Sequence, residues 1–407
     1  MESPDFFFYN MKRVLLFLFL IASVLQGFSQ LNGNGYYRVQ SYYNKRYVSL
    51  VDNRGKIDVS TTSADMAALR TVLGFERVVS DPSTIIYIKK MNSGYDLQAQ
   101  GTGSYAIITY EVLISPTGDG TYWAYASKGG MSKYLADQNV SWMWSDDDLR
   151  RIYGEMTSIG KPSATSVEAD WNILPVAASG DNYFGITPSV SAGNAYYHSF
   201  YASFPFTFSS TGMTAYYVSL VDAAKSAVVV KEVSGGVPAS TPVIVKCSSD
   251  QPANNKLNIG AATTGSASGN LLKGVYFCND VESAAHRNVV NYDSETMRVL
   301  GTATDGSLAF VKSSTLQYIP ANTAYITVEA GAPDVLKVYT QAEYDALPSA
   351  MRGDLSGDGK VSGLDLVYMG NMIIGTREKT AEADLNGDGK VSGLDYVILV
   401  NIILNQQ

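Results

Sequence analysis

The sequence is poor in cysteine and histidine, the residues that most often build nucleophilic pairs and transition-metal sites. Its 407 residues contain only Cys247, Cys278, His198 and His286. No His-Glu-x-x-His pair, nucleophile elbow, phosphate loop or cysteine–histidine cluster occurs. The two cysteines leave a disulfide and two buried thiols as open alternatives. These scarcities give no support to the commonest metal-dependent and nucleophilic enzyme classes.

Charge and long apolar runs are also scarce. Only 17% of the residues are charged, and 30 basic against 38 acidic residues make the net charge −8. A net negative chain is not expected to bind nucleic acid or an anionic membrane. No apolar run reaches the about 20 residues that a helix needs to span a bilayer, so no membrane span is expected.

The longest apolar run lies at the N-terminus. It covers Val14–Leu25 and follows the positive residues Lys12 and Arg13. A positive start, a short apolar centre and a small-residue end are typical of a secretory signal peptide. We therefore predict a signal peptide over residues 1–29, cleaved near Ser29, and an extracellular mature protein. The possible start residues are Met1 and Met11.

The chain does contain a duplicated acidic loop near its C-terminus. Residues 354–365 read Asp-Leu-Ser-Gly-Asp-Gly-Lys-Val-Ser-Gly-Leu-Asp, and residues 384–395 repeat them with asparagine in place of serine at position 3. Oxygen-bearing side chains occupy positions 1, 3, 5, 9 and 12, and the glycine at position 6 permits a sharp turn that lets position 7 offer its carbonyl. One such stretch is usually a turn, but two copies with identical spacing favour metal binding.

The loops offer hard oxygen donors, and Ca²⁺ takes ~6–8 oxygen ligands at about 2.3–2.6 Å. The three carboxylates of each loop also suit its double charge. We therefore predict two bound Ca²⁺ ions. The predicted ligands are Asp354, Ser356, Asp358, Lys360, Ser362 and Asp365 in the first loop, and Asp384, Asn386, Asp388, Lys390, Ser392 and Asp395 in the second, with both lysines acting through backbone carbonyls.

Each loop ends in aspartate, Asp365 or Asp395, where the EF-hand pattern has glutamate, and an apolar helix follows. A loop followed by a helix, duplicated over residues 351–404, resembles a type I dockerin. The resemblance implies a calcium-folded helical module over residues 351–407. It also implies docking onto a cohesin domain of another protein, typically in assemblies that degrade polysaccharides.

The same resemblance indicates which residues select the partner. In that family, loop positions 10 and 11 and the following helix contribute, and here these positions are Gly363, Leu364, Gly393 and Leu394. Because the two pairs are identical, binding in two orientations related by a half-turn is expected. Many dockerins have hydroxyl residues at these positions, so a familiar cohesin is not assumed.

The two helices have different apolar patterns. Helical spacing places Leu364, Val367, Tyr368 and Met372 on one stripe of the first helix. The second helix, residues 396–404, is apolar nearly all round. A module this small cannot cover such a helix alone. One face is expected to pack on the first helix, and another to meet a partner or the upstream domain.

The chain upstream of the repeat has short runs of tyrosine, valine, threonine and serine between turn residues, which predict β-structure. Residues 31–178 contain three recurring strand pairs, whose first strands include Tyr37, Tyr87 and Trp123. Three such units resemble a β-trefoil of the ricin-lectin type. The Gln-x-Trp signature of that family is absent, so no sugar site is carried over to named residues.

Residues 180–330 differ in composition. Phrases such as Phe204-Pro-Phe-Thr-Phe208 and Pro242-Val-Ile-Val-Lys246 predict short strands of an antiparallel β-sandwich. They resemble a β-sandwich accessory domain of large secreted and surface proteins of Bacteroidetes gut bacteria, in which no catalytic residue can be mapped. Residues 331–350 are predicted to be a linker that carries a short helix over residues 341–347.

Two groups of residues outside the repeat are candidates for carbohydrate chemistry. Trp142 and Trp144 would point to one face of a strand, where they either stack on sugar rings or belong to the core. The most clustered carboxylates are Glu155, Glu168, Asp170 and the run Asp146–Asp148, and a glycosidase needs two carboxyl groups about 5–9.5 Å apart. The sequence does not place any two of them together, so no catalytic residue is assigned.

The sequence therefore predicts a mainly β multidomain protein, with a β-trefoil-like domain and an antiparallel β-sandwich followed by a small helical dockerin. The predicted function is a secreted, non-catalytic adaptor that docks onto a cohesin-bearing partner and presents a surface to glycan or glycoprotein. One alternative is a glycoside hydrolase, or another polysaccharide-degrading component, with an unrecognised active site that hydrolyses O-glycosyl bonds. Another is a structural surface protein whose dockerin packs internally.

Overall fold

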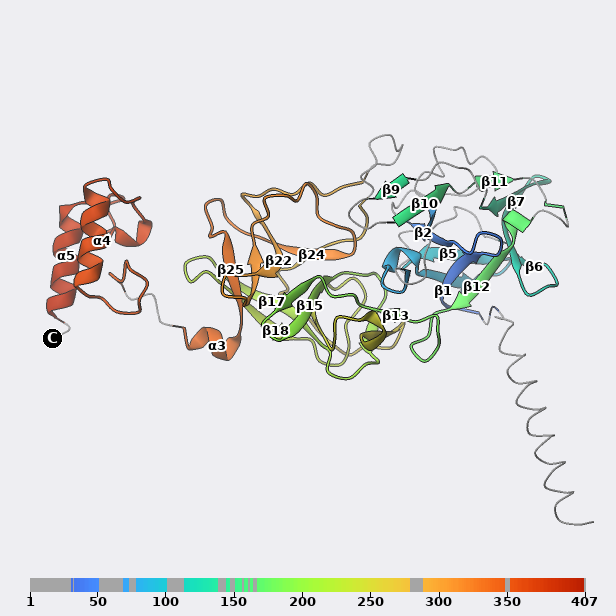
Figure 1. The fold of residues 1–407 in the computed structure, drawn as a ribbon, viewed down its shortest axis with the longest axis horizontal. Coiled ribbons are helices and arrows are strands. Elements are labelled where there is room, and N and C mark those ends of the chain that lie inside the picture. The colour runs from blue at the N-terminus through green and yellow to red at the C-terminus, as the bar shows by residue number, and fades with distance from the viewer. Residues whose placement is uncertain are drawn as a thin grey trace, which may run out of the picture.

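The computed structural model describes residues 31–405, except 32, 51–68, 73–77, 101–112, 138–143, 147–150, 156, 160–161, 164–166, 279–287 and 348–351. Figure 1 shows two β-regions followed by a two-helix module at the C-terminal end. The α-helices of the described residues are α3 (Gln341–Asp345), α4 (Gly363–Ile373) and α5 (Gly393–Leu404). The predicted mainly β fold class with a helical C-terminal module is confirmed. The predicted signal peptide, residues 1–29, lies outside the described residues.

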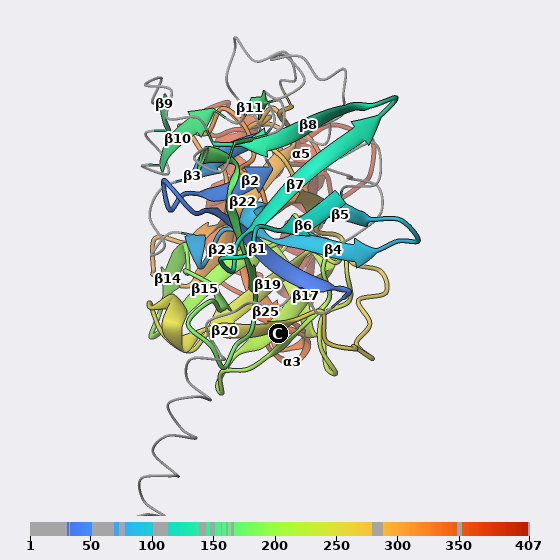
Figure 2. The same cartoon turned by 90° about the vertical axis from the view of Figure 1, so that its right-hand side faces the viewer.

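The first β-region is one curled sheet of twelve strands, and this region faces the viewer in Figure 2. Its first strand pairs with its last, because β1 and β12 are antiparallel neighbours from Tyr37↔Pro175 to Ser41↔Trp171. The strands are β1 (Gly35–Ser41), β2 (Tyr47–Leu50), β3 (Leu69–Val72), β4 (Ile86–Lys90), β5 (Tyr95–Ala99), β6 (Leu113–Pro116), β7 (Tyr122–Lys128), β8 (Met131–Ala136), β9 (Trp144–Asp146), β10 (Arg151–Glu155), β11 (Thr157–Ile159) and β12 (Trp171–Pro175).

The three predicted strand pairs of this region are antiparallel neighbours in the structure. They are β1 with β2, β4 with β5, and β7 with β8. Trp171 on β12 is fully buried in the common core and donates its indole N–H to the carbonyl of Leu135 at 3.0 Å. The segments that would complete two of the predicted units, residues 75–78 and 110–113, lie mostly outside the described residues. The β-trefoil assignment therefore stays a prediction.

The second β-region contains a ten-stranded curled sheet and a three-stranded sheet. Its strands pair in antiparallel fashion among the described residues, except that β18 and β25 are parallel. The strands are β13 (Phe184–Gly185), β14 (Val190–Ala192), β15 (Ala195–Phe200), β16 (Phe206–Phe208), β17 (Thr214–Asp222), β18 (Ala227–Glu232), β19 (Val243–Cys247), β20 (Lys256–Ile259), β21 (Lys273–Val275), β22 (Met297–Thr302), β23 (Leu308–Val311), β24 (Thr323–Thr327) and β25 (Val335–Thr340).

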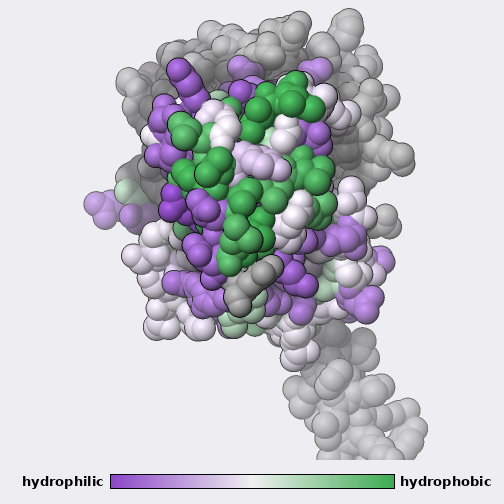
Figure 3. Space-filling view, turned by 90° about the vertical axis from the view of Figure 1, so that its left-hand side faces the viewer, coloured by the Kyte–Doolittle hydropathy of each residue, from purple (hydrophilic) through white to green (hydrophobic). Residues whose placement is uncertain are grey.

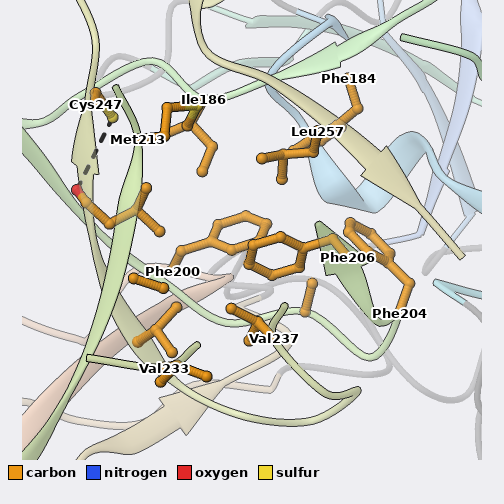
Figure 4. Close-up of a cluster of buried hydrophobic side chains, with 14 of the residues drawn as sticks. Phe184, Ile186, Phe200, Phe204, Phe206, Met213, Val233, Val237, Cys247 and Leu257 are labelled. Atoms are coloured by element: carbon orange, nitrogen blue, oxygen red, sulfur yellow. Dashed lines mark hydrogen bonds between the residues drawn. The ribbon is translucent and has the colours of Figure 1, made fainter. Parts of the chain in front are cut away.

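An aromatic core joins these two sheets. Phe206 from the small sheet packs against Phe200 from the large sheet with ring centroids 5.5 Å apart, and Phe184 packs on Phe204 at 5.6 Å (Figure 4). Cys247 lies in the same cluster as a buried free thiol, so the two cysteines are not joined to each other. Burial raises the pKa of the Cys247 thiol to about 12, which makes it an inert core residue.

The second β-region extends further along the chain than predicted. Residues 335–340, which the sequence analysis placed in a linker, form β25 between β18 and β23 of the large sheet. Leu336 on this strand is fully buried in the core. Helix α3 follows at once and is fixed by a hydrogen bond of 2.7 Å from the Tyr344 hydroxyl to Asp222. The predicted short helix is therefore present, but it belongs to the folded body.

The two β-regions share their cores. Phe277 of the second region packs in the core of the first, and Ile85 of the first packs in the core of the second. Arg38 on β1 is fully buried and donates to the Asn182 side chain at 2.7 Å and to the Tyr183 carbonyl at 2.8 Å. These contacts make the body continuous across the predicted boundary near residue 180.

Candidate functional site

The first predicted calcium loop is shaped by its own backbone donors. The Asp354 carboxylate accepts hydrogen bonds from the N–H groups of Gly357 and Gly359, both at 2.8 Å. These glycines have φ of 75° and 80°, a left-handed conformation that favours glycine and turns the N–H groups inward. The second loop repeats the contacts, with Gly387 and Gly389 donating to Asp384 at 2.7 Å.

Asp365, at position 12, closes the first loop. One carboxylate oxygen accepts from the N–H groups of Leu355 and Ser356 at 2.8 and 2.7 Å, and the other accepts from the Ser362 N–H at 2.7 Å. The side chain is fully buried, and Asp395 is buried in the same way in the second loop. Burial alone would raise the pKa of both carboxyl groups, but the backbone hydrogen bonds hold each below its ordinary value.

The loops fit a calcium ion in donor chemistry and in charge. Among the described residues, none of the six loop aspartates forms an ion pair with lysine, arginine or histidine. Three carboxylates within residues 354–365 repel one another, and a bound dication would neutralise this charge. Calcium would supply that charge and draw the loop oxygens together, with the predicted residues as its ligands.

The described residues contain no ready-made cluster of three histidine, cysteine or acidic side chains that could hold a metal. The predicted ligands other than the aspartates are hydroxyl, amide and backbone oxygens. Ligation by each named residue therefore remains a prediction.

The two helices and both loops enclose a small core. Met369 and Met372 of α4 and Leu399 of α5 are buried in it, together with Val361 and Val391 from the loops. Ser362 and Ser392 begin the helices with matching capping boxes, in which each serine accepts from the backbone and the aspartate three residues later reaches back. This core, as far as the described residues show it, is built within residues 355–403.

The same helices expose two equivalent apolar stripes. Leu364, Val367 and Ile374 are 46, 57 and 71% exposed at the first helix, and Leu394, Val397 and Leu404 are 64, 55 and 60% exposed at the second. Each residue of one stripe has its counterpart at the same offset in the other. Figure 3 looks at this end of the molecule and shows a hydrophobic patch bordered by hydrophilic residues.

The predicted partner residues lie on this surface. Gly363, Leu364, Gly393 and Leu394 are all exposed at the starts of the helices. The four residues predicted to form one stripe of the first helix do not share one environment in the structure. Met372 is buried in the core, whereas Leu364 is exposed. Ile374, Val397 and Leu404 were not predicted as part of this surface. Val397 lies 30 residues after Val367, and Leu404 lies 30 residues after Ile374, and this repeat was the signal that could have found them.

The other candidates receive less support. Trp142 lies outside the described residues, and Trp144 lies on β9 with a side chain outside them, so sugar stacking there stays a prediction. Glu155 lies on β10, and its side chain is likewise not described. Glu168 and Asp170 precede β12, where Asp170 accepts a hydrogen bond of 2.8 Å from the Trp123 indole N–H.

Comparison with known families identifies the C-terminal module. Residues 352–404 match the Dockerin type I domain, and this segment is a type I dockerin. Type I dockerins bind calcium, indicate a cohesin as partner and are typical of extracellular proteins. No curated protein matches the chain. No helix of the described residues is long and apolar enough to cross a membrane.

Four chains of solved structures match. One of them, a chain from "Structure and mode of action of a mosquitocidal holotoxin", is 9% identical in sequence with a TM-score of 0.19. The match covers 74% of this chain and 42% of that chain, so this chain spans less than half of the other's length. A similarity at this level carries no argument about fold or function.

Proposed function

We propose that this protein is a secreted, non-catalytic adaptor. Its dockerin binds two calcium ions and docks onto a cohesin-bearing partner, and its β-regions present a surface to glycan or glycoprotein in polysaccharide binding or breakdown. The observation that carries the proposal is the pair of equivalent apolar stripes on α4 and α5. Contiguous exposed apolar residues with a polar border mark interaction surfaces, because water contact with them is unfavourable.

Calcium has a defined role in this proposal. It would neutralise the aspartates of each loop and so fix the start of the helix that follows it. Since α4 and α5 begin inside the loops, at Gly363 and Gly393, the angle between the two stripes depends on both loops. Docking is therefore expected to require calcium even though the stripes themselves are apolar.

The docking test uses the mature full-length protein as bait in the secreted and surface fractions of the producing organism, with calcium and then with chelator. We expect calcium-dependent capture of a protein that carries a cohesin domain. Asp358→Ala with Asp388→Ala removes a predicted ligand from each loop and should abolish capture. Lys360→Ala with Lys390→Ala is the matched control, since both side chains are exposed and the predicted ligand there is the backbone carbonyl. Retained capture by the aspartate variant would contradict the proposal.

Two-way docking can be tested with the same partner. Leu364→Arg and Leu394→Arg each place a charge on one stripe, and the double variant charges both. If the partner binds either stripe, each single variant keeps tight binding and only the double variant loses it. Loss of binding in one single variant alone would show that only that stripe is used.

A further inference from the structure

The second calcium loop contains an asparagine that is followed directly by a glycine, Asn386-Gly387. The amide carbon of an asparagine can be attacked by the backbone nitrogen of the next residue, because the two groups can close a succinimide ring. Glycine hinders this attack least, since it has no Cβ. Both residues are exposed, and apart from the chain neighbours of Gly387 nothing lies within 4 Å of the place where its Cβ would be. The pair is therefore open to solvent and to ring closure.

The loop places polar groups on both reacting atoms of this pair. The Gly387 N–H donates to the Asp384 carboxylate at 2.7 Å, within the about 2.6–3.2 Å that proton transfer to a general base requires. The Gly389 N–H holds the other oxygen of the same carboxylate at 2.7 Å, which fixes its orientation. The Asn386 amide oxygen accepts from the Asp388 N–H at 2.9 Å, and this contact polarises the carbonyl that would be attacked. A base and an oxyanion donor are thus both in position.

The chain offers two internal comparisons for this site. The equivalent position of the first loop is Ser356, which has no amide group to lose. Another asparagine–glycine pair, Asn34-Gly35, lies at the start of β1, where Gly35 pairs with Ile88 on β4 and the Asn34 amide oxygen accepts from the Lys90 N–H at 2.8 Å. Strand pairing holds that backbone extended, so the motion that closes the ring is restricted there.

We propose that Asn386-Gly387 is a self-modification site of the calcium-free second loop. The Gly387 nitrogen gives its proton to Asp384 and forms a bond to the amide carbon of Asn386. The bond from that carbon to the side-chain nitrogen breaks, and this nitrogen takes up the proton and leaves as ammonia. Water then adds to one of the two carbonyl carbons of the succinimide and opens the ring. The product has aspartate or isoaspartate in place of the asparagine.

The inference rests on the proposed function, in which Asp384 and Asn386 are calcium ligands. A bound cation would compete with the proton for the oxygen lone pairs of Asp384, so a loaded loop is expected to react only through its unloaded fraction. Aspartate keeps a ligand at position 3, whereas isoaspartate lengthens the main chain by one carbon and disrupts the ligand spacing of the loop. The modification thus disables the second loop in protein that has stood without calcium and spares the first.

The test incubates the full-length protein with chelator and, in parallel, with calcium. Conversion of amide to acid is followed by mass spectrometry of the tryptic peptide 380–390, in which Asn386 is the single asparagine. We expect conversion in chelator that is about a hundredfold slower at a calcium concentration a hundred times the dissociation constant, because only the unloaded fraction reacts. The chelated protein is expected to react faster than the same protein unfolded in guanidinium chloride, and Asn34 is expected to convert more slowly than Asn386.

Asp384→Ala removes the base and should slow conversion in chelator roughly tenfold, less than the ~10²-fold or more of enzymatic general bases. Asp354→Ala is the matched control, since it removes the equivalent aspartate of the first loop and should leave the rate unchanged. Equal rates in wild type and Asp384→Ala, or a chelated protein that reacts no faster than the unfolded one, overturns the inference.

Calorimetric titration of calcium into freshly prepared protein keeps this inference separate from the proposed function. Two calcium sites in fresh protein without conversion of Asn386 in chelator overturn the inference and leave calcium binding in place. Conversion that calcium does not slow overturns the calcium control, together with the ligation by Asp384 and Asn386 on which it rests. Loss of one calcium site in the aged protein, with the other retained, supports selective modification of the second loop.

Discussion

The body and the dockerin of this protein are stabilised in different ways. In the body, two β-regions share apolar cores, and buried polar groups such as Arg38 and the Arg46–Asp137 pair are satisfied by other parts of the same chain. In the dockerin, a small core lies beside two loops whose aspartates have no cationic partner among the described residues. The described part of the body thus satisfies these charges internally, whereas in the dockerin loops a bound calcium ion would supply the counter-charge.

Because of this difference, the stability of the body and the attachment through the dockerin can respond separately to calcium. The buried charges in the described part of the body are satisfied within the chain, so we expect the fold of the body to persist when calcium is removed. A module whose fold is linked to calcium can attach only where calcium is present. Such linkage suits type I dockerins, which are typical of extracellular proteins.

Calcium removal is the largest expected effect. At a calcium concentration a thousandfold above the dissociation constant, binding stabilises the module by about 4 kcal/mol, and chelation removes this. We therefore expect calorimetry of the full-length protein to show two unfolding transitions, of which chelator shifts only that of the dockerin. A chelator-induced shift of the body transition would show that the body also depends on bound calcium. Magnesium in place of calcium is the control for non-specific ion effects.

Arg38→Met tests the opposite property of the body. The substitution leaves the Val78 and Tyr183 carbonyls without the guanidinium that now donates to them, at a cost of roughly 3 kcal/mol. Because Arg38 contacts both β-regions, they are expected to unfold together at a lower temperature while the dockerin transition stays in place. Arg298→Met is the matched control, since Arg298 is as buried but donates only within the second β-region. Separate transitions for the two regions in Arg38→Met would show that they are independent.

The dockerin was predictable because its chemistry is local. The hydrogen bonds that the first and last aspartates of each loop accept from backbone N–H groups join residues within 354–365 or within 384–395. The spacing of the oxygen-bearing residues along the chain is therefore enough to indicate the site. Because the loop occurs twice with identical spacing, the sequence favoured a metal site over an ordinary turn. The helices were predicted from the apolar residues that follow each loop, and the structure shows that each helix begins with a serine cap inside its loop.

The body was predictable only in its strand content. Pairings such as Tyr37 with Pro175 join residues far apart in the sequence, and no local pattern encodes them. β25 was mistaken for a linker because its position depends on β18, which lies roughly a hundred residues earlier in the chain. The hydrogen bonds that Asp170 accepts from Tyr42 and Trp123 were not predictable for the same reason, because they join three separate segments of the chain.

The smallest expected effect lies within the dockerin, where the two loops differ at position 3. Asn386 accepts from the Asp388 N–H at 2.9 Å and donates to its carboxylate at 3.0 Å, whereas Ser356 accepts the Asp358 N–H only at 3.4 Å. An amide carbonyl is also a better calcium ligand than a hydroxyl group. We therefore expect the first loop to bind calcium more weakly, and Ser356→Asn to raise its affinity a few-fold.

Calorimetric titration of calcium into the apo protein measures this difference directly. Asn386→Ser is the reciprocal variant and should weaken the second site by a similar factor, which gives two nearly equal weak sites. Two equal sites in the wild-type protein would contradict the prediction. Because the loops are otherwise alike in sequence, backbone conformation and helix cap, any inequality that Ser356→Asn removes must come from this one ligand.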